Sequence, residues 1–404
     1  MQMNMHTVQI GIKNNSTNKG NGVVSKTFNI YISLLIFSII NRSFVPFGID
    51  FKYINLMLCC ILWMFSVKRM LLVFDSNTKW VQLLYMLIFL SIFNQHIDIY
   101  DASVFKNVII LNLYNYVNIC TLGIYVKYID AIQVKKKLNF AMLFLTISMV
   151  LAACGVELPF NSYQSFSMLS NSGARYCGYG SDPNYVCVMA ACLIIYCHAF
   201  EQDKKARKFE YLMGVLIIAM SRSQSVIVLI VLVSIISLFI ERANLWSKKV
   251  ALLFIFIALA TIPVLLVLIR PLNSSVSMAI RYGMWERALN AASNHFFFGN
   301  GLMSARNNSY YKAHWFVQCH STYFQILCEQ GIFALFLYFV IFYKNVERNA
   351  YSALKYCFLI YFIWSFTYET MYLTYPILFF AIFPYCTDEK IKEDYNEKNS
   401  DINN

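Results

Sequence analysis

The run STYFQILCEQGIFALFLYFVIFY, residues 321–343, decides the fold class of this chain. A helix needs about 20 predominantly apolar residues to cross the hydrocarbon core of a bilayer, and this run is long enough. The whole chain of 404 residues has the same character, since 59% of it is hydrophobic and only 13% is charged. A soluble domain carries about a quarter charged residues. The composition therefore excludes a soluble or disordered chain and indicates an integral membrane protein.

Apolar runs of similar length recur along the sequence. Beside 321–343 they lie near 28–45, 51–67, 80–95, 104–126, 138–155, 183–200, 209–220, 224–240, 250–270, 351–367 and 370–386. The sequence therefore predicts an all-α, polytopic membrane protein with about 12 transmembrane helices. The runs at 209–220 and 224–240 are short, so the turn between them is expected to lie below the membrane surface.

The basic residues predict the orientation of the chain. Most of the 33 Lys and Arg residues fall on alternate connecting segments, beginning with the N-terminal one, which places both termini in the cytoplasm. The net charge of +12 is therefore a topology signal that also attracts anionic lipid headgroups, and does not indicate nucleic-acid binding.

The domain organisation follows from this topology. We expect a cytoplasmic tail at 1–27, a single transmembrane catalytic domain at 28–386 and a disordered cytoplasmic tail at 387–404. Two predicted external loops are long, at 156–182 and 271–320. Loops longer than about 15 residues are usually functional.

The predicted outer face is rich in arginine, whereas lysine predominates on the cytoplasmic side. Arginine presents a planar fork that binds phosphate with two hydrogen bonds, which a lysine cannot do. The pattern indicates an outer face that binds an anion. The outer arginines are Arg42, Arg175, Arg222, Arg270, Arg281, Arg287 and Arg306.

The first long loop contains SGARYCGYGSDPNYVC, residues 172–187. Ser181 or Asp182 can cap a helix that begins at Pro183, and Arg175 lies among glycines just ahead of it. A glycine-rich loop before a helix N-terminus is typical of an anion site, although a flexible turn is the alternative. Arg222 lies in the recessed turn, where a charge needs a cavity or a partner; an interfacial Arg is the alternative.

The second long loop contains SMAIRYGMWERALNAA, residues 277–292, which predicts an amphipathic helix on the outer surface. Its apolar stripe puts Arg281 at the inner border and Arg287 toward solvent. Thr322 and Gln325 resemble a capping box, which would place His320 just before a helix N-terminus. A neutral imidazole there could act as a general base, and an interfacial histidine with an ordinary hydrogen bond is the alternative.

Cysteine and histidine spacing indicates no metal site, and we expect no cofactor. The 12 cysteines fall mostly inside apolar runs. Cys177 and Cys319 lie in the predicted external loops, and whether they form a disulfide is left open by the sequence.

Four local patterns together resemble the O-antigen polymerase and ligase superfamily (Wzy and WaaL). They are R-x-x-G-x-x-x-D-P-N at Arg175 to Asn184, the Ser-Arg break at Ser221-Arg222, R-x-x-x-W at Arg281 to Trp285, and a final set at Gly299, Gly301, His320, Gln325, Glu329 and Gly331. Ser321 departs from the pattern, since Asn commonly follows the histidine.

The resemblance implies a GT-C-like, metal-independent glycosyltransferase of the bacterial inner membrane with a large late periplasmic loop and an active site that faces the periplasm. Its donor would be an oligosaccharide on undecaprenyl diphosphate. Arg175, Arg222 and Arg281 would bind the diphosphate, and His320 and Arg281 would be catalytic. Membrane lipids, a flippase and a chain-length regulator are the implied partners.

Polymerase and ligase share these local motifs. The polymerase joins lipid-linked repeat units, whereas the ligase transfers finished polymer to the lipid A core. The Arg175 to Asn184 block favours the polymerase. A flippase or other transporter of lipid-linked oligosaccharide is a further alternative, but the chain shows no internal repeat and has a long outer loop that carries Arg281 and His320.

Overall fold

The computed structural model describes residues 18–66, 78–161, 167–170, 173–180, 182–201, 203–242, 253, 276–313, 319–349, 353–366 and 368–386. The predicted span at 250–270 lies outside these residues apart from Leu253, as does the predicted tail at 387–404.

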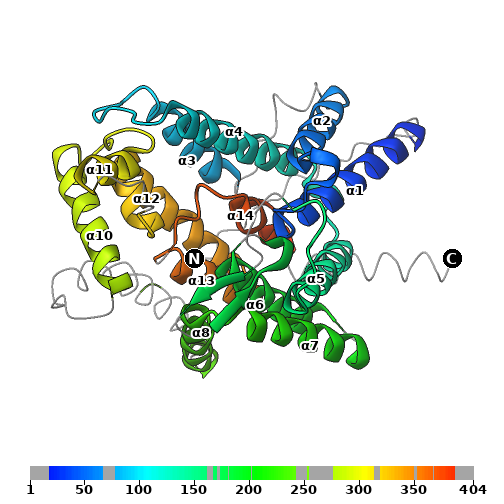
Figure 1. The fold of residues 1–404 in the computed structure, drawn as a ribbon. Coiled ribbons are helices and arrows are strands. Elements are labelled where there is room, and N and C mark those ends of the chain that lie inside the picture. Colours follow the sequence, from blue (N-terminus) through cyan, green and yellow to red (C-terminus); the bar gives the residue numbers. More distant parts are fainter. Residues whose placement is uncertain are drawn as a thin grey trace, which may run out of the picture.

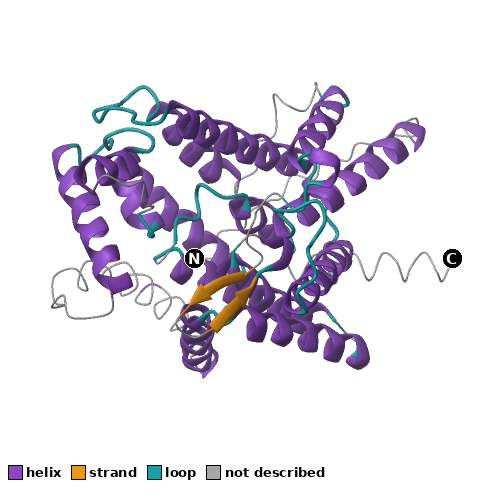
Figure 2. Ribbon diagram, in the orientation of Figure 1, coloured by secondary structure: helices purple, strands orange, loops and turns teal. Residues whose placement is uncertain are grey.

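The described chain is built from helices and one short hairpin (Figures 1 and 2). The helices are α1 (Asn18–Ile40), α2 (Phe51–Met64), α3 (Thr78–Leu90), α4 (Ala102–Ile124), α5 (Ala131–Ala153), α6 (Pro183–Phe200), α7 (Lys204–Ser221), α8 (Gln224–Arg242), α10 (Val276–Asn294), α11 (Ser304–Ala313), α12 (Thr322–Arg348), α13 (Leu354–Trp364) and α14 (Tyr375–Ile377). The strands β1 (Ser167–Ser170) and β2 (Gly173–Tyr176) pair antiparallel.

Five of these helices are long and apolar enough to cross a membrane: α1 from Gly22, α4, α5, α6 and α12. Shorter apolar helices occupy the other described spans except 209–220, which lies in α7. The polytopic helical class predicted from the sequence is therefore confirmed, whereas the count of about 12 spans stays a prediction. α1 begins at Asn18, earlier than the predicted start of the first span, and α5 begins at Ala131.

Eight helices form a closed ring of packed neighbours. Within the described chain, each contacts the next in the order α1, α2, α4, α3, α12, α13, α6, α5 and back to α1. α14 lies near the centre of this ring in Figure 1 and contacts α4. The π-helical turn that follows α14, Leu378–Ile382, contacts α3, α4 and α13. The last described segment is thus enclosed by helices.

The predicted span at 370–386 is not one continuous helix. Residues 368–374 form a loop, and α14, a π-helical turn and a 3₁₀ turn (Phe383–Tyr385) follow it. All described residues from 368 to 386 are buried. Irregular backbone at membrane depth needs partners from the protein. Here Asn115 of α4 donates to the carbonyl of Leu373 at 2.7 Å, and Thr322 of α12 accepts from the N–H of Thr370 at 2.8 Å.

Aspartate side chains begin many of the helices. Asp50, Asp101, Asp130, Asp182 and Asp203 each accept a hydrogen bond from a backbone N–H in the first turn of α2, α4, α5, α6 and α7. A side-chain oxygen at this position satisfies a donor that has no partner within the helix. The predicted cap at Asp182 with Pro183 in the first turn is confirmed.

The predicted capping box at the start of α12 is wrong. Ser321 is the N-cap residue, and its side chain makes no capping hydrogen bond. The Thr322 hydroxyl donates instead to the carbonyl oxygen of Tyr368 at 2.6 Å. The loop after α13 has displaced the local cap, because a tertiary partner satisfies the groups at this helix end.

Two glycine motifs of the sequence meet at a kink in α12. Gly331 has φ +81° inside the helix, and Gly299, with φ +74°, packs against the same turn. The N–H of Asn300 donates to the carbonyl of Cys328 at 2.8 Å, which joins the two segments. A Cβ on Gly331 would lie 2.3 Å from the carbonyl oxygen of Phe297. Glycine is required there by both backbone conformation and close approach.

We expect Gly331→Ala to destabilise the protein more than Gly155→Ala does. Gly155 also has a left-handed backbone, φ +79°, but nothing lies within 4 Å of a Cβ built on it. The control therefore measures the loss in the free energy of unfolding that a left-handed alanine causes by itself, about 1–2 kcal/mol. Gly331→Ala adds overpacking of about 1–3 kcal/mol. Thermal unfolding in detergent checks this, and equal melting temperatures for the two variants would contradict it.

Candidate functional site

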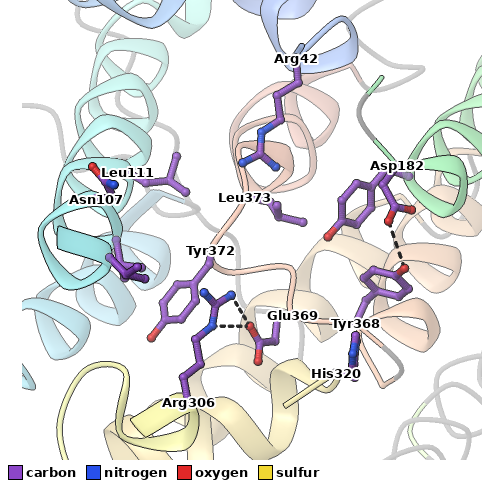
Figure 3. A pocket seen from close by; sticks show the side chains of 13 residues that line it. Arg42, Asn107, Leu111, Asp182, Arg306, His320, Tyr368, Glu369, Tyr372 and Leu373 are labelled. Carbon is purple, nitrogen blue, oxygen red and sulfur yellow. Dashed lines mark hydrogen bonds and ion pairs between the residues drawn. The ribbon is translucent and has the colours of Figure 1, made fainter. Parts of the chain in front are cut away.

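A polar cavity of about 370 Å³ lies beside the loop 368–374 (Figure 3). One wall is apolar and belongs to α4, where Val104, Val108 and Leu111 line it. The other walls carry charged and polar groups from distant parts of the chain. They are Arg42, Asn107, Asp182, Tyr185, Arg306, His320, Tyr368, Glu369 and Tyr372, with Leu373 beside them.

His320 faces this cavity from the short connection before α12. Its backbone is left-handed, with φ +50°, which is uncommon for a residue other than glycine. Both polar backbone atoms of the preceding Cys319 are bonded: its N–H donates to Glu369, and its carbonyl accepts from the indole N–H of Trp285 at 3.0 Å. The backbone at His320 is thus held from two sides, by α10 and by the loop 368–374.

Arg306 and Glu369 form the ion pair at the floor of the cavity. The Nε and Nη2 of Arg306 donate to one carboxylate oxygen of Glu369 at 3.1 and 2.7 Å, and both side chains are largely buried. The other carboxylate oxygen accepts from Cys319. Glu369 therefore links Arg306 of α11 to the backbone that carries His320. Since its carboxylate neutralises Arg306, this arginine is not a free cation.

The His320 imidazole is kept neutral by its surroundings. Burial lowers its pKa below the ordinary value of about 6.5, with Arg281 and Arg306 adding to the effect and Glu369 and Asp182 opposing it. Its Nδ1 is buried and has no hydrogen-bond partner among the described residues. A neutral ring with an uncommitted nitrogen can accept a proton from a bound hydroxyl.

Arg175 lies in a network beside His320. Its Nη2 donates to Asn184 at 2.8 Å, and its Nε donates to the carbonyl of Ser221 at 3.0 Å. The Asn184 amide donates in turn to the hydroxyl of Tyr368, whose ring packs edge-on to that of His320 at 6.0 Å between centroids. Three of the sequence motifs are therefore brought together around one tyrosine.

Asp182 completes this network from the start of α6. The Tyr368 hydroxyl donates to it at 3.4 Å, and burial raises the pKa of Asp182. The side chain lines the cavity and at the same time caps α6.

Two arginines near the site are uncommitted, in the sense that no described residue forms a hydrogen bond or an ion pair with their side chains. Arg42 follows the end of α1 and its guanidinium reaches into the cavity in Figure 3. Its neighbours Asn41 and Ser43 are fully buried, and both bond to the protein. Arg281 of α10 lies close enough for its charge to act on both His320 and Tyr368. Neither arginine has a hydrogen-bond or ion-pair partner in the part of the chain that the structure describes.

Arg222 does not line the cavity, although the carbonyl of the adjacent Ser221 accepts from Arg175. Arg222 ends α7 in a left-handed conformation, with φ +47°, and its side chain is exposed. None of the three arginines predicted to bind diphosphate lines the cavity among its described residues. Arg175 and Arg281 nevertheless lie around Tyr368 at its border, and the assignment of all three stays a prediction.

The predicted amphipathic helix is confirmed as α10, but its apolar stripe packs on protein. Tyr282 and Trp285 are buried in a cluster with Cys319, and Trp285 meets Phe324 of α12 at 5.5 Å between ring centroids. Arg287, predicted to face solvent, is instead half-buried, and its Nε has no hydrogen-bond partner among the described residues.

The sequence left open whether Cys177 and Cys319 form a disulfide. In the structure both cysteines are buried and no disulfide joins them. Within the described residues, no group of three or more His, Cys, Asp or Glu side chains is placed to hold a metal ion.

Sequence reasoning missed Glu369 and did not single out Arg42 or Arg306 from the other outer arginines. Glu369 had a signal, since it is an acidic residue between two strongly apolar runs, where charges are usually functional. For Arg42 the sequence carries no signal beyond the predicted side of the membrane. Its place in the cavity depends on how α1 packs against α5.

Part of the chain that carries site residues resembles a known protein family. Residues 211–339 match the family model described as O-antigen ligase. The match includes Arg222, Arg281, Arg306 and His320, and confirms the resemblance to the O-antigen polymerase and ligase superfamily over this stretch. None of the curated proteins compared matches the chain.

Proposed function

We propose that this protein, similar over residues 211–339 to the O-antigen ligase family, is a surface-polysaccharide polymerase. It joins repeat units linked to undecaprenyl diphosphate on the outer face of the bacterial inner membrane. The observation that carries the proposal is the cavity itself, where the neutral His320 and the uncommitted Arg42 lie within one polar pocket.

The chemistry assigned to this pocket is a glycosyl transfer. A hydroxyl at the non-reducing end of one repeat unit attacks the anomeric carbon of the chain on the donor lipid. The new glycosidic bond forms as the bond from that carbon to the diphosphate breaks. His320 takes the proton of the hydroxyl, and undecaprenyl diphosphate leaves with its electron pair.

Arginines supply the charge that this leaving group needs. Negative charge develops on the diphosphate as the bond breaks, and cations held in place beforehand stabilise it. Arg42 and Arg281 are the uncommitted cations beside His320 and take this role. Arg175 at the border of the cavity and Arg222 outside it are further ligands. The reaction requires no metal in this scheme.

The ligase is the alternative, and the family match supports it equally well. In that reaction the same donor is transferred to the lipid A core. The block from Arg175 to Asn184 favours the polymerase, and in the structure Arg175, Asn184 and Asp182 all join the network at His320.

The surroundings of the site follow from the reaction. The cavity faces the periplasm, both termini are cytoplasmic, a flippase delivers the lipid-linked repeat units, and a chain-length regulator is the expected partner. These assignments rest on the basic-residue pattern of the sequence and on the chemistry of the donor.

A gel of surface polysaccharide tests the proposal. A strain lacking this gene is compared with the complemented strain. Loss of the ladder with a single repeat unit left on the core supports the polymerase. A bare core with polymer accumulating on the donor lipid contradicts it in favour of the ligase, and an unchanged ladder contradicts glycosyl transfer altogether.

The acid limb of the pH–rate profile is expected below pH 6.5. His320 must be neutral to accept a proton, and its folded pKa is lowered, so the rate falls only as the pH drops through that lowered value. Transfer measured in purified membranes from pH 4.5 to 8 checks this. An acid limb above pH 6.5 would show that His320 is not the titrating base.

Arg42→Ala and Arg281→Ala are each expected to reduce the transfer rate by about 10²–10³-fold, the usual loss for a group that stabilises developing charge. Lys106→Ala is the matched control, because Lys106 is an exposed cation of α4 one residue before Asn107, which lines the cavity. Rates are compared at equal protein content in membranes. A rate for Arg42→Ala equal to that of Lys106→Ala removes Arg42 from the site.

A further inference from the structure

A second and larger cavity, about 550 Å³, lies in the groove between α1 and α5. It shares no lining residue with the catalytic cavity. Its residues on α5 are Gln133, Lys136, Lys137, Phe140 and Phe144, which recur at helical spacing and therefore lie on one face. Along that face the groove changes from cationic to aromatic over roughly 12 Å.

The aromatic part of the groove is built from five phenylalanines. Phe37 of α1 meets Phe144 of α5 at 5.1 Å between ring centroids, and Phe44 meets Phe144 at the same distance. Phe51 closes the far end. Phe140 is 64% exposed, so the groove opens away from the packed ring. An apolar surface of this kind on a membrane protein is covered by hydrocarbon chains.

The cationic part of the groove contains two lysines that form no ion pair within the described residues. Lys136 is exposed and has no ion-pair partner in the described residues. Lys137 donates to the amide oxygen of Asn29 at 3.1 Å and forms no ion pair in the described residues, although the charge of Asp130 acts on it. The adjacent Lys135 differs, because it is buried and paired with Glu201 and Glu210. Two cations thus remain at the end of the groove.

We infer that this groove binds an anionic phospholipid, with its phosphate on Lys136 and Lys137 and an acyl chain along the phenylalanines. Basic pockets between helices at the cytoplasmic side bind acidic headgroups, and hydrocarbon fills the aromatic wall. The inference does not depend on the proposed function.

The charged end of the groove lies away from the catalytic cavity, which favours a bilayer phospholipid over the glycosyl donor. Lys137 contacts Asn29 about midway along α1, whereas Arg42 of the catalytic cavity follows the end of that helix. From Asn29 to Ile40 the helix extends roughly 17 Å. Lys136 and Lys137 belong to a basic segment that the sequence predicts on the cytoplasmic side, so the phosphate would lie on that side.

Native mass spectrometry of the full chain tests this inference. Protein purified in detergent is titrated with phosphatidylglycerol and with phosphatidylcholine of the same acyl chains. We expect phosphatidylglycerol to bind about tenfold or more tightly in the wild type, since each lysine near a charged surface contributes. The variant K136Q/K137Q should bind both lipids equally, and F140A should weaken binding of both.

The matched control is K204Q/K205Q, which removes two exposed lysines from the start of α7. It should keep the wild-type preference. Equal affinity for the two lipids in the wild type, or the same loss in both double variants, overturns the inference. Displacement of phosphatidylglycerol by undecaprenyl phosphate, with no displacement by excess phosphatidylglycerol in return, overturns it in favour of the donor lipid.

Discussion

Replacing His320 with asparagine is expected to lower the rate of glycosyl transfer by about 10²–10⁴-fold, the usual contribution of a general base. Asparagine is chosen because His320 has a left-handed backbone, φ +50°, which asparagine tolerates better than alanine does. The variant therefore removes the imidazole without adding backbone strain. Transfer is measured in membranes that contain equal amounts of protein.

His295→Ala is the matched control for this experiment. His295 lies after α10, in the same predicted outer loop, and stacks on His96 at 3.7 Å between ring centroids, away from the cavity lining. It should transfer sugar at the wild-type rate. Wild-type activity in His320→Asn would remove His320 from the reaction, whatever the control shows.

Breaking the Arg306–Glu369 pair is expected to cost about 3–5 kcal/mol of stability, the usual loss when a buried ion loses its partner. Arg306→Met leaves the carboxylate of Glu369 buried, where its side chain is only 1% exposed. Lys52→Ala is the control, since its ion pair with Asp50 is about one-third exposed and should contribute about 0–1 kcal/mol. Denaturant unfolding in detergent compares the two, and equal losses would contradict the prediction.

The same pair is expected to position His320 and to tune its pKa. Glu369 raises that pKa and Arg306 lowers it, so Glu369→Gln should move the acid limb of the pH–rate profile to lower pH, and Arg306→Gln should move it to higher pH. Glu369→Gln keeps an oxygen that can accept from the N–H of Cys319. A merely structural pair would change protein yield and leave the acid limb in place.

The sequence determined those features that depend on local pattern. Apolar runs predicted the helices that are long and apolar enough to cross a membrane, since about 20 apolar residues match the thickness of the hydrocarbon core. Asp182 and Pro183 predicted the start of α6 from backbone donors that a neighbouring side chain can satisfy. The motifs at Arg222, Arg281 and His320 fall within the stretch that matches the O-antigen ligase family.

Sequence patterns failed where a distant segment supplied the partner. The predicted capping box at Thr322 was wrong, because the Thr322 hydroxyl donates to the carbonyl oxygen of Tyr368. The predicted span at 370–386 is not one continuous helix, because surrounding helices replace the bilayer as its environment. The apolar stripe of α10 was correctly identified. The stripe packs against α12, and the hydrophobic periodicity of α10 does not specify which element it packs against.

Only the tertiary structure shows which charged side chains lie together in the cavity. Arg42 and Glu369 lie at opposite ends of the chain, yet both line one cavity, because the ring of helices encloses the C-terminal segment. The sequence by itself determined the helical membrane class and the family to which residues 211–339 are similar. The surroundings of His320 depend on contacts between residues far apart in the chain, and hydrophobic period and capping chemistry carry no information about such contacts.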